Sequence, residues 1–178
     1  MPAKTLPSTV TTFLSLAAAL AALAFYSGEA HAQSLRISGD LDYAAELAGR
    51  EAGIGGGGAL RAGAQLDLIV ATLILEGGGS YHGFGGDDEV NVWRGLAGGE
   101  VRIGKILEPG LFAHAGVGHL SGVGAFTAPA VDVGLALDLT IIPLIDIGAH
   151  VAYNALLGNA DRDGFSWLTA GLHAALVI

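Results

Sequence analysis

Charged and imidazole side chains recur at every second position along much of this chain, and they are the groups best suited to chemistry. A β-strand sends alternate side chains to opposite faces, so residues spaced in this way share one face of a sheet. Buried charges persist only when they are paired and hydrogen-bonded. We therefore expect ion-pair networks, with Arg61 and Arg102 bonded to Glu76 and Glu100. This polar face holds four arginines, nine carboxylates and several neutral or imidazole groups: Arg36, Asp40, Asp42, Glu46, Arg61, Gln65, Asp67, Glu76, Arg94, Glu100, Arg102, Asp132, Asp138, Asp146, His150 and His173.

The histidines are the candidate metal ligands. His114, His150 and His173 fall on the polar face, and His82 falls near the end of a predicted strand. A metal site needs three or four ligands that converge at about 2 Å from the ion, and the spacing gives no sign of convergence. We therefore predict satisfied interior histidines, with no catalytic, cofactor-binding or metal-binding residues. The run Asp87-Asp88-Glu89 could bind a divalent cation through oxygen, but it is more typical of a solvated loop tip.

The elements that position these groups are strands with one apolar face. Val131 to Leu139 shows the pattern, since every odd position is a large aliphatic residue and every even one is acidic or small. No lysine, arginine, aspartate or glutamate of a predicted strand falls on the apolar face. Eight such strands are predicted, near Leu35–Leu47, Ala59–Asp67, Thr72–His82, Trp93–Gly104, Leu111–Leu120, Ala130–Thr140, Leu144–Asn154 and Phe165–Val177.

The connections between these strands alternate in length. Three are short: Leu68–Ala71, Lys105–Gly110 and Ile141–Pro143. Outer-membrane barrels have this asymmetry, with long loops outside the cell and tight turns in the periplasm. The four longer connections are rich in turn formers: Gly49–Gly58, Gly83–Val92, Ser121–Pro129 and Leu157–Gly164. We expect Gly55–Gly58, in the first of them, to be flexible loop.

The N-terminus and the composition bound the class of protein. An apolar stretch at Phe13–Phe25 precedes Ala30 and Ala32, which fit the small-residue rule for signal-peptide cleavage. We expect residues 1–32 to be a cleaved signal peptide and 33–178 to be one domain. The chain contains no cysteine, which excludes disulfide and thiolate chemistry, and its net charge of −9 argues against nucleic acid as a partner.

Alternation alone does not say which face lies inside a closed barrel. A secreted lipocalin-like barrel would turn its aliphatic face inward to hold a small apolar ligand. Two features favour the opposite arrangement. The polar face carries glycines between its charges, as a crowded interior requires, and Lys105 is the only lysine beyond the predicted signal peptide. The sequence therefore predicts an all-β, antiparallel, up-and-down transmembrane barrel.

Aromatic residues gather beside the long connections, where an outer-membrane barrel has an interfacial girdle. The opposite end offers little beyond Phe112. The aromatic residues assigned to the girdle are Tyr81, Phe84, Trp93, Phe126, Tyr153, Phe165 and Trp167.

From Gln33 to Ile178 the chain resembles the OmpA/OmpX type of small outer-membrane barrel, in strand number, alternation and loop asymmetry rather than in a diagnostic motif. The last strand, with Leu172, Ala174 and Leu176, is similar to the signal that this family presents to the barrel-assembly machinery, although the chain ends in Ile178 instead of an aromatic residue. The resemblance implies both termini in the periplasm, outer-membrane lipid and lipopolysaccharide as partners, and a monomer.

The pair His119 and Ser121 is similar to the His-x-Ser pair of outer-membrane lipid A deacylases, which act with a later glutamate. Both residues fall on the apolar face, but the third member is missing, because Asp132 points to the other face. A base needs an orienting partner.

The sequence thus predicts a non-catalytic outer-membrane protein with a structural and interfacial role. Three competing hypotheses are a lipocalin-like binder, a lipid A hydrolase using His119 and Ser121, and a conducting pore, which the small diameter of eight strands disfavours.

Overall fold

The structure is a computed structural model, and it describes residues 33–47, 53–85, 89–122, 124–159 and 163–178. The predicted signal peptide at residues 1–32 and the acidic residues Asp87 and Asp88 lie outside the described residues. No helix among the described residues is long and apolar enough to span a membrane.

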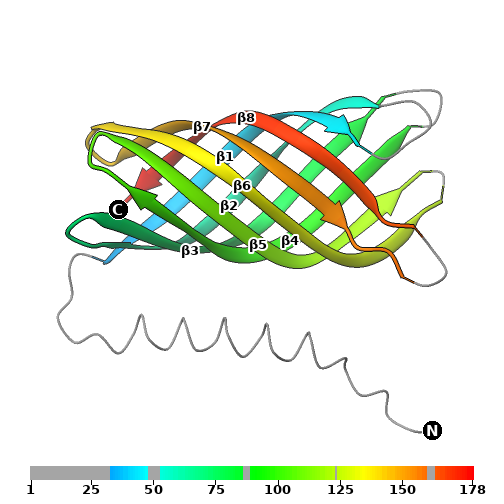
Figure 1. Cartoon of the computed structure of the whole chain (residues 1–178), viewed down its shortest axis with the longest axis horizontal. Coiled ribbons are helices and arrows are strands. Elements are labelled where there is room, and N and C mark those ends of the chain that lie inside the picture. Colours follow the sequence, from blue (N-terminus) through cyan, green and yellow to red (C-terminus); the bar gives the residue numbers. More distant parts are fainter. Residues whose placement is uncertain (1–32, 48–52, 86–88, 123, 160–162) are drawn as a thin grey trace, which may run out of the picture. The chain divides into compact units, whose positions relative to one another are not determined.

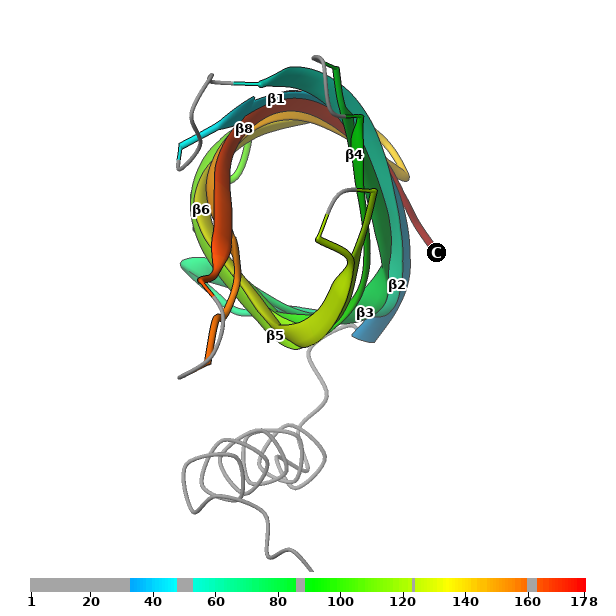
Figure 2. The same cartoon turned by 90° about the vertical axis from the view of Figure 1, so that its right-hand side faces the viewer.

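The described chain folds into a closed antiparallel barrel in which each strand pairs with its neighbours in sequence, as predicted (Figures 1 and 2). The first strand also pairs with the last, from Arg36–Val177 to Glu46–Trp167, and this pairing closes the ring. The strands are β1 (Gln33–Glu46), β2 (Ile54–Asp67), β3 (Ala71–Phe84), β4 (Val90–Ile103), β5 (Leu107–Ser121), β6 (Phe126–Ile142), β7 (Ile145–Leu156) and β8 (Phe165–Val177).

The two ends of the barrel differ. The chain enters β1 and leaves β8 at the end that holds the short connections between β2 and β3, β4 and β5, and β6 and β7 (Figure 1). We call this the turn end and the opposite one the loop end. At the turn end, Leu35 and Ile178 exchange two backbone hydrogen bonds of 2.7 and 2.8 Å. The predicted turns near 67–72 and 140–144 are confirmed, and Leu144 with a φ of 68° forms part of the second one.

Burial shows which face lies inside. Leu41 is 78% exposed, Leu60 72% and Leu172 66%, whereas Arg102 is 1% exposed and Asp138 is fully buried. The aliphatic face is therefore the outside of the barrel and the charged face is its lumen, as predicted. Every charged residue within a described strand is buried or half-buried, and the exposed charged residues among those described lie in connections: Glu89, Lys105 and Asp163. A lipocalin-like barrel, with its large aliphatic residues inside, is inconsistent with this arrangement.

The expectation that Gly55–Gly58 is flexible loop was wrong. These residues belong to β2 and pair with Tyr43, Asp42 and other residues of β1 and with β3. A Cβ at Gly55 or Gly57 would collide with the backbone carbonyl oxygen of Gly83 or Tyr81. Glycine lets the strands approach closely here, but it has no side chain to show alternation, so the predicted strand starts too late. β5 and β6 likewise begin earlier than predicted, at Leu107 and Phe126.

The predicted outer girdle was wrong for four of its aromatic residues, one of which, Phe126, is partly buried and packs against the cluster that contains the other three inside the loop end. Phe84, Phe165 and Trp167 are at most 9% exposed and point into the lumen, where their rings stack at centroid distances of 5.4–6.0 Å. Tyr81, Trp93 and Tyr153 do face outward. The inward rings form an apolar cap inside the loop end, together with Ala44, Val92, Leu96, Leu120, Ala128, Ala130 and Leu156, against which Val90 and Phe126 pack.

Candidate functional site

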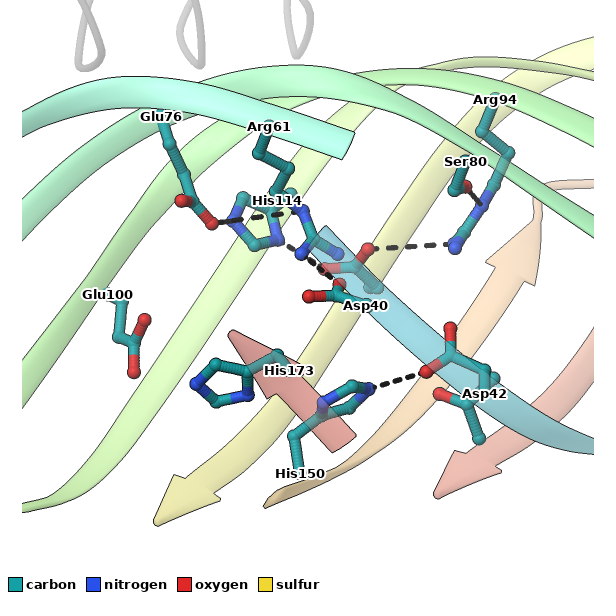
Figure 3. Close-up of polar contacts among 12 residues, drawn as sticks. Asp40, Asp42, Arg61, Glu76, Ser80, Arg94, Glu100, His114, His150 and His173 are labelled. Atoms are coloured by element: carbon teal, nitrogen blue, oxygen red, sulfur yellow. Dashed lines mark hydrogen bonds and ion pairs between the residues drawn. The ribbon is translucent and has the colours of Figure 1, made fainter. Parts of the chain in front are cut away.

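The candidate site is the polar lumen between the turn end and the apolar cap, and strands from all around the barrel contribute to it. Alternation places the side chains, because every second residue of each strand points inward. Figure 3 shows the middle of this lumen, where charged side chains from several strands converge. An eight-stranded barrel is just wide enough for its interior side chains to fill it.

Arg102 organises the part of the lumen nearest the turn end. Its guanidinium lies 2.8 Å from Glu100, 3.2 Å from Asp146 and 3.3 Å from Asp138. Glu100 and Arg102 are two residues apart on β4, so they share a face. The predicted Arg102–Glu100 pair is confirmed, but within one strand rather than between strands. A guanidinium with several donors can hold three carboxylates, and this one cross-links β4, β6 and β7.

Glu108 is an interior acid that the strand prediction leaves out. It is 8% exposed, and its carboxylate lies 3.4 Å from the Thr140 hydroxyl. The prediction puts this position in the turn Lys105–Gly110, whereas β5 already begins at Leu107. The alternation from Glu108 through Gly110 and Phe112 to His114 is the signal that would have placed it in the lumen.

Arg36 and Arg61 occupy the middle of the lumen. Arg61 forms an ion pair with Asp40 and lies 3.7 Å from Glu76, which confirms the predicted contact. Arg36 reaches the same Glu76 at 3.4 Å. His114 joins this network through both ring nitrogens, 3.2 Å from Glu76 and 2.7 Å from Asp132 (Figure 3). The network links β1, β2, β3, β5 and β6.

Arg94 marks the boundary between the polar lumen and the cap. Its guanidinium donates hydrogen bonds to Ser80 at 2.9 Å and to Asn154 at 2.7 Å, and lies 3.6 Å from Asp132. On its other side it lies 4.8 Å from the ring centroid of Trp167. A cation held over an indole face gains from the ring quadrupole. The charged network thus ends against the aromatic cap with this guanidinium fully engaged.

Each interior histidine of the described strands contacts a carboxylate. His82 and His150 each place Nε2 2.9 Å from Asp42, and His173 places Nε2 2.5 Å from Asp138. His114 contacts Glu76 and Asp132, as given above. These contacts agree with the prediction that the interior histidines are paired. The structure adds that Asp40, His150 and His173 each bring one potential ligand atom within 4.8 Å of the others.

The pair His119 and Ser121 lies outside the lumen, as its parity indicates. His119 is exposed, and its Nδ1 lies 2.9 Å from the Thr127 hydroxyl. The Ser121 hydroxyl donates to the backbone carbonyl of Asn91 at 3.2 Å. In the part of the chain that the structure describes, no carboxylate forms a hydrogen bond with either residue.

Comparisons with known proteins match this geometry at the level of the fold. No protein-family profile matches the chain, and no characterised protein matches it in sequence. Among solved structures, Neisserial surface protein A has a TM-score of 0.64 at 12% identity, over 82% of this chain and 99% of that chain. Ail, the attachment invasion locus protein of Yersinia pestis, has a TM-score of 0.50 at 19% identity, over 82% and 97% of the two chains. The outer membrane enzyme PagL has a TM-score of 0.49 at 16% identity, over 78% and 99%.

The fold defines the class. The chain shares the fold of Neisserial surface protein A and is a closed β-barrel of eight antiparallel strands in up-and-down order. The resemblance to the OmpA/OmpX type of barrel is confirmed for the architecture. At these sequence identities the likeness concerns the fold alone.

Proposed function

We propose that this chain is an integral outer-membrane protein with a structural and interfacial role and no catalytic activity. The observation that carries the proposal is the outer surface. Exposed large aliphatic residues lie on seven of the eight strands, and on β3 the exposed large hydrophobic residue is Tyr81. The exposed charges among the described residues lie in connections between strands. An arginine or lysine facing lipid at the bilayer midplane costs about 2–4 kcal/mol, so a membrane environment explains the separation.

The arrangement of the ends supports one orientation. In outer-membrane barrels the short turns face the periplasm and the longer loops face the outside. The turn end, where β1 begins and β8 ends, then lies in the periplasm. The loop end lies at the cell surface, where the connections at 47–53, 85–89, 122–125 and 157–164 would contact lipopolysaccharide headgroups and other cells. The first three of these connections are shorter than the sequence predicted and the fourth has the predicted bounds, so the surface for a specific receptor is small.

The lumen supports a structural plug in preference to a conducting pore. Trp167 in the cap and Asp138 in the Arg102 network have no exposed surface, and Arg102 is 1% exposed. Two successive levels of the barrel are therefore filled by side chains. The interior ion pairs cross-link strands, and this stabilising role requires no turnover or transport.

The first test is a comparison of boiled and unboiled samples on a detergent gel after cell fractionation. Folded barrels resist detergent for kinetic reasons, so we expect a heat-dependent shift in migration for protein in the outer-membrane fraction. Protein that is found without detergent in the soluble fraction, and that shows no shift, would contradict the proposal.

Two further measurements distinguish a structural barrel from a pore and from a hydrolase. Purified barrel in planar bilayers should give no conductance steps, and regular steps would favour the pore. The substitution His119→Ala should leave lipid A unchanged by mass spectrometry, whereas a loss of deacylated species would favour the hydrolase.

A receptor role is tested at the loop end. Deleting residues 85–89 removes one connection but spares β3 and β4. We expect the shortened protein to reach the outer membrane and to leave adhesion of the cells unchanged. A lost adhesion phenotype in cells that still hold the folded barrel would count against a purely structural role.

A further inference from the structure

Asp40, His150 and His173 meet in the middle of the lumen although they are far apart in sequence. In the strand register Asp40 on β1 pairs with His173 on β8, and His173 pairs with Gly148 on β7. His150 is the next inward residue of β7 after Gly148. One ligand atom from each side chain lies within 4.8 Å of the other two. Figure 3 shows the two imidazole rings next to each other, close to the Asp40 carboxylate.

Glycines make room for these imidazoles. A Cβ at Gly148 would lie 2.6–2.7 Å from ring atoms of His173. A Cβ at Gly171 would collide with Oδ1 of Asp42 and the carbonyl oxygen of Leu41, and would lie 3.0 Å from Cε1 of His150. These distances are shorter than van der Waals contact, so both positions accept only glycine while the rings keep their places. The register therefore builds a pocket around the two rings.

Each of the two imidazoles contacts a carboxylate through its Nε2 atom. Asp42 lies 2.9 Å from Nε2 of His150, and Asp138 lies 2.5 Å from Nε2 of His173. A carboxylate that accepts the Nε2 proton fixes the neutral tautomer whose lone pair is on Nδ1. Metal-binding histidines almost always carry such a partner on the nitrogen that does not bind the ion. The arrangement thus presents Nδ1 of both rings as the ligand atoms.

Space and an oxygen ligand are available beside the rings. A cavity of about 30 Å³ is lined by Ser38, Asp40, His150 and His173, among others, and a polar cavity of that size admits an ion or a water molecule. Arg61 binds Oδ2 of Asp40, so Oδ1 remains for a cation. The hydroxyl of Ser38 is buried in the cavity wall and has no hydrogen-bond partner.

From this geometry we propose that the lumen binds one divalent transition-metal ion, of which zinc is the representative, through Asp40, His150 and His173. Two imidazoles and one carboxylate form a ligand set suited to zinc, with water completing the coordination. Tetrahedral zinc ligands lie roughly 3.3 Å apart, because each bond is about 2.0 Å long, so small rotations of the side chains close the site. The ion also offsets negative charge in a lumen whose carboxylates outnumber its arginines.

Zinc chloride is the probe for the test. The full-length protein, produced without a polyhistidine tag and purified from membranes in detergent, is stripped with chelator and dialysed against zinc. Bound metal is measured by atomic emission. We expect one zinc ion per chain, and binding at least about tenfold weaker in both His150→Gln and His173→Gln, since even the loss of an outer-shell partner costs 10–100-fold.

One variant controls for a histidine outside the proposed ligand set. His119→Gln removes an exposed imidazole that lies outside the lumen. It should bind zinc like the wild type. Folding of each variant is checked by its heat-dependent migration. A folded wild type that retains no zinc would overturn the proposal, and so would His150→Gln and His173→Gln variants that retain as much zinc as the wild type.

The wild type alone also decides the question if these variants fail to fold. Cobalt(II) replaces zinc in such sites and reports its coordination through visible absorption. Intense bands typical of four or five ligands, removed by competing zinc, would support the site. A weak spectrum like that of hexaaqua cobalt would overturn it.

Discussion

At the scale of single residues, the interior charges act as a set. Each guanidinium in the described lumen forms an ion pair with a carboxylate on another strand. Removing one partner from a buried pair is strongly destabilising, since it leaves the other charge desolvated and unpaired. Arg102 is the sharpest case, with three carboxylates within 3.3 Å and only 1% of its surface exposed.

We expect Arg102→Met to destabilise the barrel by about 3–5 kcal/mol, because Glu100, Asp138 and Asp146 lose their shared cation. Urea-induced unfolding in lipid vesicles, followed by tryptophan fluorescence, measures the change. Lys105→Met is the control, because this side chain is exposed in a connection and its loss should change stability by no more than about 0.5 kcal/mol. Equal effects of the two substitutions would contradict a stabilising role of the network.

The aromatic cap gives a second prediction at this scale. Trp167 is fully buried against Phe84, Phe165 and Arg94, so Trp167→Ala should cost about 3–5 kcal/mol through the cavity it leaves. Trp93 is exposed on the outside, and Trp93→Ala should cost distinctly less. The midpoint of the heat-dependent gel shift compares the two variants. A larger loss for Trp93 would place the important ring in the girdle instead of the cap.

At the scale of elements, β2 depends on glycine for its close fit between β1 and β3. A Cβ at Gly63 would lie 2.7 Å from Cα and Cβ of Glu76 and would collide with the carbonyl oxygen of Leu75. Gly95 on β4 faces outward, and a Cβ there would meet nothing within 4 Å. The two positions therefore make a matched pair for the same substitution.

We expect Gly63→Ala to destabilise the barrel by about 1–3 kcal/mol through overpacking. Gly95→Ala should be neutral or stabilising by about 0.4–1 kcal/mol, because alanine restricts the unfolded chain more than glycine does. Urea unfolding in vesicles measures both. A destabilisation by Gly95→Ala as large as that by Gly63→Ala would show that chain flexibility, and not space, explains the glycines of this barrel.

Most of the strand pattern could be predicted from sequence, because a period of two is a direct consequence of strand geometry. The inward and outward assignments of Val131 to Leu139 hold throughout. The errors lie where the alternation is absent from the sequence or where the prediction does not use it. Gly55–Gly58 has no side chains to alternate. Trp167 is assigned to the girdle because it is near a loop, although it is adjacent to the outward-facing Leu168 and alternation therefore places it inside.

The candidate site could be predicted only in part. Parity is enough to put Asp40, His150 and His173 in the lumen, but it does not give their height along the barrel axis. That height depends on the register of β7 with β8 and of β8 with β1, which sets His173 opposite both Asp40 and Gly148. Register is fixed by pairing between strands far apart in sequence, so the meeting of these three residues is not visible in the spacing.

At the scale of the whole molecule, the apolar outer surface determines the environment. Leu135 lies near the middle of β6 and is 59% exposed, whereas Leu157 lies just beyond β7 at the loop end. For a barrel in a bilayer, Leu135→Arg should cost about 2–4 kcal/mol and Leu157→Arg about 0–1 kcal/mol, because the cost of a charge depends on its depth. Urea unfolding in vesicles measures both. Equal, small costs would contradict a lipid-facing belt.

The hydrogen-bonded pair of Leu35 and Ile178 has a consequence for how freely the chain can be rewired. Because β1 and β8 end side by side, a short peptide between residues 178 and 33 would complete one more hairpin around the ring, and the covalent order of the strands would become cyclic. New ends could then be cut into any connection at the loop end. A circular permutant opened between β7 and β8 should keep the same strand pairing and the same heat-dependent migration. The chain termini of this barrel could then be placed at whichever loop-end connection is wanted.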